Sequence, residues 1–233
     1  MTKGPGDPEF DQRRAEARAR LTDLVGSSGD DASARRTWFE QVYDLADDDP
    51  AAVPWADLAP KPVLLDWLAA HPGDGRLAID VACGLGDNAE AIAAAGYETT
   101  AFDLAEGAIT WARRRFAHSP VDYHVADLFN LLPEWQARFD FVHETYTIQA
   151  LQGDLRAAAF SAVASLVRPG GLLLVVCRSR EEGQEVVGPP WPLSPGELAR
   201  FDALGLVRDV EKDFVVEQPD RSIPHRKIVF RKS

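Results

Sequence analysis

The sequence predicts an α/β protein built on a doubly wound sheet, with a helical addition at its N-terminus. From residue 77 onward, short apolar segments typical of buried strands alternate with segments of helical character. A tight turn of small residues, Cys83–Gly86, follows the first of these apolar segments. Acidic residues stand where several strands should end, and ligands of doubly wound sheets bind beyond those carboxyl ends. These three observations indicate both the fold class and the edge of the sheet that carries the function.

The composition indicates one ordinary globular domain with an N-terminal addition. The 233 residues are 45% hydrophobic, and the formal net charge is −12. Nucleic-acid partners usually require a basic face, whereas the basic residues here are scattered along the chain. No apolar run approaches the ~20 residues of a membrane helix, and the first residues lack the apolar core of a signal peptide. We therefore expect a small-molecule partner, no nucleic acid and no membrane.

The cysteine content bears on the compartment and on metal binding. Cys83 and Cys177 are the only cysteines, and both fall in segments predicted to be buried strands or turns. Two cysteines make a structural zinc site implausible, and the acidic run Asp47–Asp49 lacks an ordered spacing of ligands. The sequence therefore predicts a reduced, cytoplasmic protein without a metal site.

The N-terminal third reads as helices that precede the sheet. Trp38, Phe39 and Tyr43 lie at near-helical spacing, which is typical of a helix packed on a core. The alternative is a lid over the active site, in which Trp38, Tyr43 and Trp55 would contact substrate. We expect residues 1–72 to form this extension or lid and residues 73–233 to form the core. The predicted N-terminal helices are Pro8–Val25, Ala32–Ala46 and Lys61–His71, with a break at Gly26–Asp31.

The stretch Leu77–Asp103 predicts one strand–turn–helix–strand unit. Gly84 and Gly86 would let a ligand approach the backbone at the end of the first strand. The helix that follows points free N–H groups at the same place. Asp103 comes about 20 residues after the turn, the spacing at which a carboxylate accepts hydrogen bonds from ribose hydroxyls. The unit therefore predicts a nucleoside site.

Further strands and helices alternate to the end of the chain. Arg168–Gly171 is predicted to be a turn before the fifth strand, and Arg178–Pro192 a long irregular loop. Ser194, Pro195 and Glu197 predict a capping box at the start of a helix. The remaining predicted helices are 105–117, 151–167 and the one after Ser194, and the remaining strands are 121–126, 139–144, 172–177, 206–217 and 226–231.

The segment Asp80–Gly86 reads Asp-Val-Ala-Cys-Gly-Leu-Gly. It resembles motif I of the class I S-adenosylmethionine (SAM)-dependent methyltransferases, which usually runs acidic-x-Gly-x-Gly-x-Gly. Ala82 replaces the first glycine and leaves a slightly larger side chain in the turn. The dinucleotide-binding fingerprint fits less well, because its three glycine positions would be Ala82, Gly84 and Asp87.

The resemblance covers roughly Leu77–Ser233 and implies a Rossmann-like, seven-stranded sheet. The implied strand order is 3-2-1-4-5-7-6 with the last strand antiparallel, and the implied cofactor is SAM. In this family, a residue at the position of Asp127 bonds the adenine amino group; the alternative for Asp127 is a cap on a short helix. The residues predicted to bind the cofactor are Asp80, Ala82, Cys83, Gly84, Gly86, Asp103, Leu104, Asp127, Leu128 and Glu144.

The segment His143–Gln149 forms the end of the fourth predicted strand. In this family, the end of that strand faces the methyl group of SAM. Glu144 is the first candidate for a base, or for a polar partner of the substrate or of the methionine group. Its alternative is an exposed loop carboxylate. His143 and Tyr146 are further catalytic candidates, although His143 is equally compatible with a satisfied core histidine. Tyr146 and Gln149 are expected to position the acceptor, unless they are structural.

A second, weaker resemblance concerns the acceptor. Gly188–Trp191, with Ser194 and Glu197, is similar to the segment after strand five in bacterial relatives of thiopurine methyltransferase. Val53–Trp55 is similar to their tryptophan-containing N-terminal segment. Both favour a thiol or another soft acceptor as one possibility. The residues predicted to bind substrate are Trp38, Tyr43, Trp55, Tyr146, Gln149, Arg178 and Trp191.

The leading hypothesis is SAM-dependent methyl transfer to a small molecule. A nicotinamide-dependent oxidoreductase of related fold is an alternative, although the chain has no Tyr-x-x-x-Lys pair. A non-catalytic protein that binds SAM or a nucleotide is another. The sequence leaves open the acceptor, whether oxygen, nitrogen or sulfur is methylated, whether a base is used, and the oligomeric state.

Overall fold

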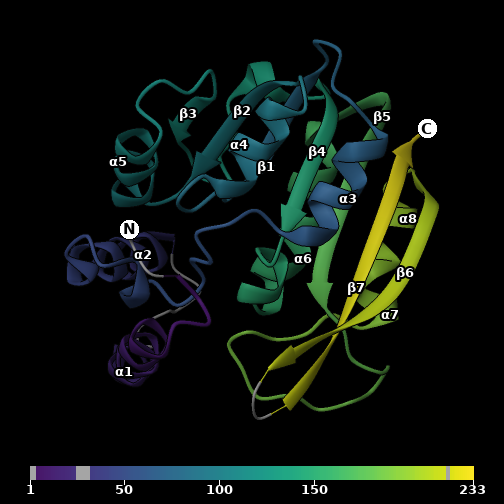
Figure 1. The fold of residues 1–233 in the computed structure, drawn as a ribbon. Helices are drawn as coiled ribbons and strands as arrows, with labels where there is room; N and C mark the ends of the chain where they lie inside the picture. The colour runs from purple at the N-terminus through teal and green to yellow at the C-terminus, as the bar shows by residue number, and fades with distance from the viewer. Residues whose placement is uncertain (1–3, 25–31, 219–220) are drawn as a thin grey trace.

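The computed structural model describes residues 4–24, 32–218 and 221–233, and places seven strands in one sheet (Figure 1). The strands are β1 (Leu77–Val81), β2 (Glu98–Asp103), β3 (Asp122–Val125), β4 (Phe139–Thr145), β5 (Val167–Arg178), β6 (Leu206–Gln218) and β7 (Arg221–Lys232). Their order is β3-β2-β1-β4-β5-β7-β6. The pairs from β3 to β5 are parallel, whereas β7 is antiparallel to β5 and to β6. The predicted fold class, strand order and antiparallel last strand are confirmed.

Helices cover both faces of the sheet, as expected for a doubly wound fold. On one face, α6, α7 and α8 pack their apolar side chains against β1, β4, β5 and β7. On the other face, α3 and α4 pack against the same central strands, and the outermost helix, α5, packs near β3. The helices are α1 (Pro8–Leu24), α2 (Ala32–Ala46), α3 (Pro62–Ala70), α4 (Asp87–Ala94), α5 (Glu106–Arg115), α6 (Gly153–Leu166), α7 (Pro195–Leu198) and α8 (Arg200–Ala203), with short 3-10 turns η2 (Pro50–Ala52), η3 (Pro133–Trp135) and η4 (Ile148–Ala150).

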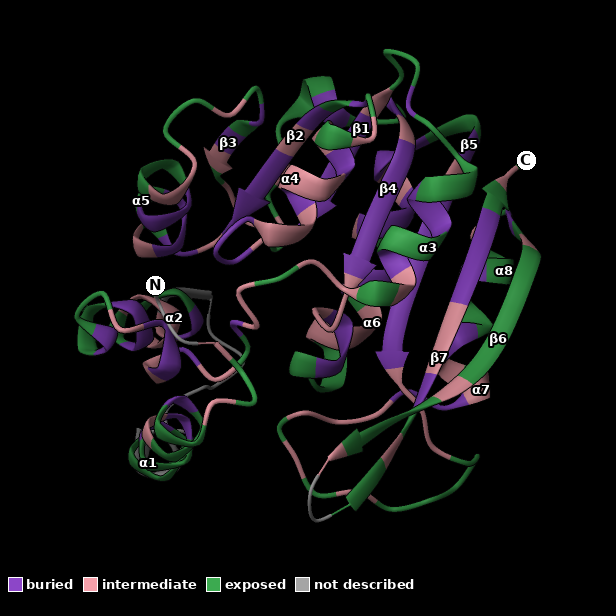
Figure 2. Cartoon of the chain, viewed as in Figure 1, coloured by how far each residue is buried: buried purple, intermediate pink, exposed green. Residues whose placement is uncertain are grey.

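The central strands are buried on both faces, which explains their nearly continuous apolar sequences (Figure 2). Along β4, successive side chains alternate between the two faces. Phe141 packs in the cluster formed with α3 and α4, and Val142 packs in the cluster formed with α6. His143 therefore shares the face of Phe141, whereas Glu144 shares the face of Val142.

The N-terminal elements α1 and α2 lie beside the carboxyl edge of the strands rather than on a face of the sheet (Figure 1). α3 differs, because Trp67 stacks on Phe141 of β4 with ring centroids 4.3 Å apart. The predicted boundary between extension and core at residue 72 stays a prediction. Val25 and the predicted break at Gly26–Asp31 lie outside the described residues.

The predicted turn at Arg168–Gly171 is wrong, because these residues lie inside β5. They form a bulge in the pairing with β4. Phe139 pairs with Val167 and Phe141 pairs with Leu172, so one residue of β4 faces four residues of β5. Gly170 has a φ of 76°, which glycine adopts without strain. The proline and glycines that predicted a turn therefore mark a bulge within β5.

Other local predictions are confirmed by the hydrogen bonds that they require. The Ser194 hydroxyl accepts a bond from the Glu197 N–H, and the Glu197 carboxylate accepts one from the Ser194 N–H, which completes the capping box.

In the described parts of the chain, none of the helices combines the length and the apolar character needed to cross a bilayer.

Ala82 occupies a backbone conformation that favours glycine, with a φ of 51°. Its side chain is exposed, so removing the methyl group sacrifices little packing. We expect Ala82→Gly to raise the free energy of unfolding by about 0.5–1 kcal/mol in urea titrations. Ala91→Gly, in the middle of α4, also deletes one alanine methyl group and should lower the free energy of unfolding by about 1 kcal/mol. Equal destabilisation by both changes would contradict the strain at Ala82.

Candidate active site

The turn after β1 presents backbone rather than side chains at the carboxyl edge of the sheet. Ala82, Gly84 and Gly86 have φ angles of 51°, 54° and 90°. A Cβ on Gly86 would lie 2.4 Å from the Tyr123 hydroxyl, so packing against β3 requires this glycine. A Cβ on Gly84 would lie 3.7 Å from the Tyr43 hydroxyl, an ordinary contact. Of the two glycines predicted to approach a ligand, only Gly84 has room for a side chain, and that room is bounded by Tyr43 and Trp55.

Asp103 ends β2 and joins this turn to the next one. One carboxylate oxygen accepts a hydrogen bond from the Gly84 N–H, and the other accepts one from the Ala105 N–H, both at 3.0 Å. The side chain is buried, and this burial raises the pKa of Asp103 to about 6, although the backbone N–H donors oppose the shift. Each carboxylate oxygen retains a lone pair for a further donor.

Asp127 follows β3 and is held by a residue of α2. The Arg35 guanidinium contacts both Asp127 carboxylate oxygens at 3.0 Å, and the Phe129 N–H donates to one of them. The guanidinium also stacks over the Phe129 ring, 4.7 Å from its centroid. The alternative for Asp127, a cap on a short helix, is wrong, because a tight turn rather than a helix follows it; the carboxylate bonds the N–H two residues on in this turn.

Two further contacts fix α2 over this edge. The Glu40 carboxylate accepts bonds from the Glu106 N–H at 2.7 Å and the Gly107 N–H at 3.2 Å, which caps the N-terminus of α5. The Tyr43 hydroxyl accepts a bond from the Trp55 indole N–H at 3.0 Å, beside Gly84. Trp38, Phe39, Tyr43 and Trp55 form one aromatic cluster.

A buried polar chain runs from β1 to the end of β4. Asp80 and His143 are paired in register, and an Asp80 carboxylate oxygen lies 2.7 Å from His143 Nδ1. His143 Nε2 lies 2.7 Å from the Thr145 hydroxyl. An ionised Asp80 can only accept, so Nδ1 carries the proton and Nε2 accepts from Thr145. His143 is fully buried, whereas Thr145 is half-buried and forms the accessible end of the chain.

Glu144 is buried on the opposite face of β4 rather than exposed in a loop. One carboxylate oxygen accepts bonds from the Thr147 N–H at 2.7 Å and the Ile148 N–H at 3.1 Å. The other oxygen is buried and has no partner among the described residues. Burial raises the pKa of Glu144 to about 7. The exposed-carboxylate alternative is therefore wrong, because the turn after β4 folds back onto the side chain.

The residues after β4 lie at the same carboxyl edge. Tyr146 has a φ of 69°, a strained conformation for this residue. Its ring contacts the His225 ring, with centroids 5.6 Å apart, and the Lys61 ammonium, 4.6 Å from the centroid. Gln149 is buried, and its side-chain oxygen accepts a bond from the Arg178 N–H. Its carbonyl oxygen accepts a bond from the Trp191 N–H.

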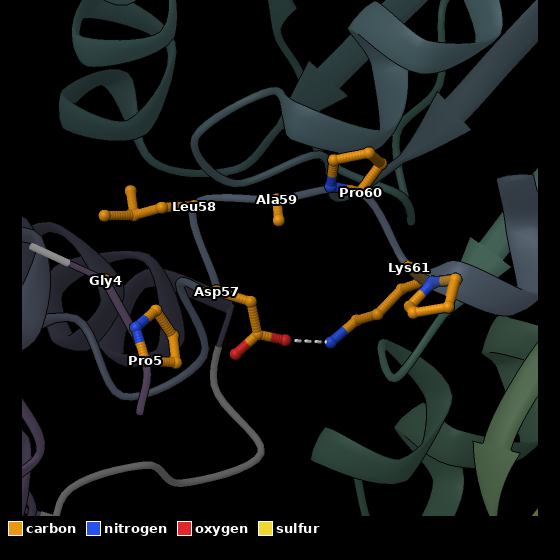
Figure 3. Close-up of a pocket in the computed structure, with 8 residues that line it drawn as sticks. Gly4, Pro5, Asp57, Leu58, Ala59, Pro60 and Lys61 are labelled. Carbon is orange, nitrogen blue, oxygen red and sulfur yellow. Dashed lines mark hydrogen bonds and ion pairs between the residues drawn. The ribbon is translucent and has the colours of Figure 1, made fainter. Parts of the chain in front are cut away.

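A cavity of about 460 Å³ lies between the N-terminal segment and the linker that leads to α3 (Figure 3). The ion pair between Lys61 and Asp57 crosses its wall. The Lys61 ammonium thus stands between this cavity and the Tyr146 ring. The volume lies within the range of small-molecule sites. The lining residues are Gly4, Pro5, Asp57, Leu58, Ala59, Pro60, Lys61 and Pro62.

Some predicted site residues have mainly packing roles, and some contributors were missed. Leu128 is buried in the core, and the Leu104 carbonyl accepts a bond from Arg36. Thr145 was missed, although its spacing of two from His143 on a strand could have identified it. Arg35 and Glu40 were missed because single charged residues within a helix carry no sequence signal that separates a buried position from an exposed one. Within the described ranges, no group of three or more His, Cys, Asp and Glu side chains could hold a metal ion.

Comparisons with known proteins agree with this geometry. Residues 78–171 match the family described as Methyltransferase domain. The ubiquinone biosynthesis O-methyltransferase of Aromatoleum aromaticum is 35% identical over 114 residues, which are 48% of this chain and 48% of that protein. The chain thus matches about half the length of these curated relatives.

Solved structures share the fold over more of the chain. The 1,6-didemethyltoxoflavin-N1-methyltransferase of Burkholderia thailandensis, crystallised with 1,6-didemethyltoxoflavin and S-adenosylhomocysteine, matches with a TM-score of 0.67 and 21% identity. The match covers 87% of this chain and 88% of that chain. The magnesium protoporphyrin IX methyltransferase of Synechocystis matches with a TM-score of 0.59 and 15% identity, covering 96% and 93%.

Proposed function

We propose that this chain, which carries a methyltransferase domain of the class I, SAM-dependent family, transfers a methyl group from SAM to a small-molecule acceptor. The observation that carries the proposal is the meeting of Gly84, Asp103 and Asp127 at neighbouring strand ends. SAM supplies a methyl group on a sulfonium, which an acceptor atom displaces in line. The chain must therefore hold the cofactor, exclude water and, for a hydroxyl or ammonium acceptor, remove a proton.

The residues at the carboxyl edge fit this cofactor. Asp103 is fixed by two backbone donors and keeps lone pairs suited to ribose hydroxyls. Asp127 offers carboxylate oxygens of the kind that accept from an adenine amino group. Glu144 has one buried oxygen without a partner, which suits an ammonium group such as that of the methionine moiety. In each of these three assignments a carboxylate oxygen of the chain accepts a hydrogen bond from a donor of the cofactor.

We propose that α2 acts as the lid over this site. Arg35 contacts Asp127, Glu40 caps α5, and the Tyr43 hydroxyl lies beside the Gly84 turn. Such a cover would exclude water from the reacting methyl group. Trp38, Tyr43 and Trp55 then line the cofactor end as well as the acceptor end, so their assignment to substrate stays a prediction.

We propose that Thr145 takes the acceptor proton while it passes its own hydroxyl proton to His143 Nε2, so that His143 is the base and Asp80 positions it. The chain of two 2.7 Å hydrogen bonds from Asp80 to Thr145 gives the proton a path to the imidazole, and Asp80 stabilises the resulting imidazolium. A base is needed for an oxygen acceptor, and the curated relatives are named as O-methyltransferases. A thiol acceptor, the alternative from the second resemblance, would need the base much less.

The alternative functions are less well supported. The antiparallel strand β7 is the arrangement that the methyltransferase resemblance implies. A nicotinamide cofactor is disfavoured because Ala82 and Asp87 stand at two of the three glycine positions of the dinucleotide-binding fingerprint. A non-catalytic binding protein would have no use for a buried polar chain that ends in a half-buried hydroxyl. The net charge of −12 supports a small acceptor over a nucleic acid. A cytoplasmic location stays a prediction.

The first prediction concerns cofactor binding. Asp103→Asn should weaken S-adenosylhomocysteine binding about tenfold or more, because a hydrogen bond to a charged group contributes ~1.5–3 kcal/mol. Since the pKa of Asp103 is about 6, the wild-type affinity should fall roughly tenfold as the pH falls from 7 to 5 and the carboxylate is protonated.

Calorimetric titrations at several pH values measure both effects. The difference between the wild-type and Asp103→Asn profiles isolates Asp103, because Glu144 titrates in both proteins. Asp122→Asn, at an exposed carboxylate near the opposite edge of the sheet, is the control and should leave the affinity unchanged. An Asp103→Asn protein with wild-type affinity and wild-type pH dependence would remove ribose recognition from the proposal.

The second prediction concerns the proton. For a hydroxyl acceptor, Thr145→Val should lower kcat by ~10²–10⁴, the usual contribution of a positioned base, while S-adenosylhomocysteine still binds. His143→Gln should produce a similar loss and alter the pH profile of kcat. Thr99→Val is the matched control, because this buried hydroxyl bonds the Tyr97 carbonyl near the start of β2. Turnover of an acceptor panel by each variant provides the measurement.

The outcomes separate the two candidate bases and the two acceptor classes. A large loss in Glu144→Gln with normal turnover in Thr145→Val would transfer the role of base to Glu144. Full activity of all the variants on a thiol, with no turnover of hydroxyl compounds, would favour the soft acceptor.

A further inference from the structure

Two cationic side chains and a histidine surround Tyr146 on one face of the sheet. Lys61 precedes α3, and its ammonium lies 4.6 Å from the centroid of the Tyr146 ring. His225 of β7 contacts the other side of that ring, with centroids 5.6 Å apart. Arg178, the last residue of β5, is the direct pairing partner of His225. Opposite residues of an antiparallel pair project to the same face, so Arg178 lies beside His225 and Tyr146.

Arg178 stands out because it is half-buried and its guanidinium has no partner in the part of the chain that the structure describes. Its backbone N–H bonds Gln149, but within the described residues its guanidinium has no hydrogen bond and no ion pair. The nearby arginines differ, because Arg180 pairs with Glu197 and Arg226 pairs with Asp213. A partly desolvated guanidinium without an anion is costly, so it suits a position where an anion arrives from outside.

The charges around Arg178 have the same sign. Burial lowers the pKa of Arg178, and the neighbouring cations Arg221 and Arg18 lower it further. The pKa of His225 is lowered by burial and by the charges of Arg178 and Lys61. Among the described residues, Asp57 is the nearer anion to Tyr146, and it pairs with both Lys61 and Arg14. In a chain with a net charge of −12, a half-buried guanidinium that has no anionic partner among the described residues is therefore a specific feature, not a reflection of composition.

The position of this group relative to Thr145 defines what it can bind. Thr145 pairs in register with Val176 of β5, and Arg178 follows two residues later. With strands ~4.8 Å apart and ~3.3 Å per residue, the two backbones are separated by roughly 8 Å. That spacing suits one small molecule, about the size of a substituted aromatic ring, that reaches both. The cavity of about 460 Å³ beside Lys61 is lined by neither Thr145 nor Arg178, so it adjoins this position through Lys61 rather than enclosing it (Figure 3).

We propose that the methyl acceptor carries an oxyanion, a carboxylate or a phosphate, and that Arg178 binds it with the help of Lys61 and the Tyr146 hydroxyl. A guanidinium forms paired hydrogen bonds with either group, which a lysine ammonium cannot do. This inference rests on the proposed function, because it names the class of acceptor for the same site. It also gives the strained backbone of Tyr146 a purpose, since that conformation holds the ring between Lys61 and His225.

The test measures binding of three probes to the full chain saturated with S-adenosylhomocysteine. Benzoate and phenyl phosphate carry the two oxyanions, and benzamide is their neutral counterpart. Ligand-observed NMR gives the affinity of each. At least one oxyanion should bind about tenfold or more tightly than benzamide, and the preferred probe distinguishes a carboxylate acceptor from a phosphate acceptor.

Three variants attribute this binding to Arg178. Arg178→Gln should lower the affinity for the oxyanion about tenfold or more and leave S-adenosylhomocysteine binding unchanged, which also shows that the protein is folded. Arg178→Lys should lose less, because it keeps the charge but not the paired donors. Arg138→Gln removes the same charge from an exposed residue before β4, at the opposite edge of the sheet, and should change nothing.

The outcomes keep this inference separate from the proposed function. If S-adenosylhomocysteine binds but neither oxyanion binds better than benzamide, the anionic acceptor is wrong and the proposed function stands. The same holds if Arg178→Gln binds the oxyanion as well as the wild type does. If S-adenosylhomocysteine itself does not bind, the proposed function fails first.

Discussion

The carboxylate of Asp103 holds together the two turns on which the candidate site depends. One oxygen bonds the Gly84 N–H and the other bonds the Ala105 N–H, so the loops after β1 and β2 share one acceptor. A buried carboxylate is costly unless donors surround it, and here the backbone provides them. Burial raises the pKa of Asp103, but the backbone donors oppose the shift, so the pKa reaches only about 6 and the group is mostly ionised at neutral pH. A ligand that meets Asp103 thus meets a fixed, charged acceptor.

The rest of the edge is built around that fixed point by α2. Arg35, Glu40 and Tyr43 come from one helix and contact three successive parts of the edge: Asp127 after β3, the start of α5, and the Gly84 turn. Because each contact joins the extension to a different loop, the lid and the proposed cofactor site are expected to move together. Burial of Tyr43 beside Asp103 also raises the pKa of the Tyr43 hydroxyl, which keeps it a neutral hydrogen-bonding group.

Periodicity and glycine placement predicted the framework well, because strands buried on both faces leave a clear apolar signal. Leu77–Val81 was predicted to the residue, and so was Ala32–Ala46. The turn expected at Arg168–Gly171 failed, because glycine marks a bulge and a turn alike. The acidic residues at strand ends were identified, whereas the environment of Glu144 was not, because its burial depends on how the following turn folds back. Arg35 depends on a contact with Asp127 that no local pattern encodes, whereas Thr145 could have been found from its spacing of two from His143 on the strand.

The central claim is that this edge recognises a SAM-type nucleoside rather than a dinucleotide. Calorimetric titration of the full wild-type chain with S-adenosylhomocysteine, and separately with NAD⁺, tests it most directly. The account predicts saturable binding of one S-adenosylhomocysteine per chain and no binding of NAD⁺ at the same concentrations. Binding of NAD⁺ without binding of S-adenosylhomocysteine would contradict it.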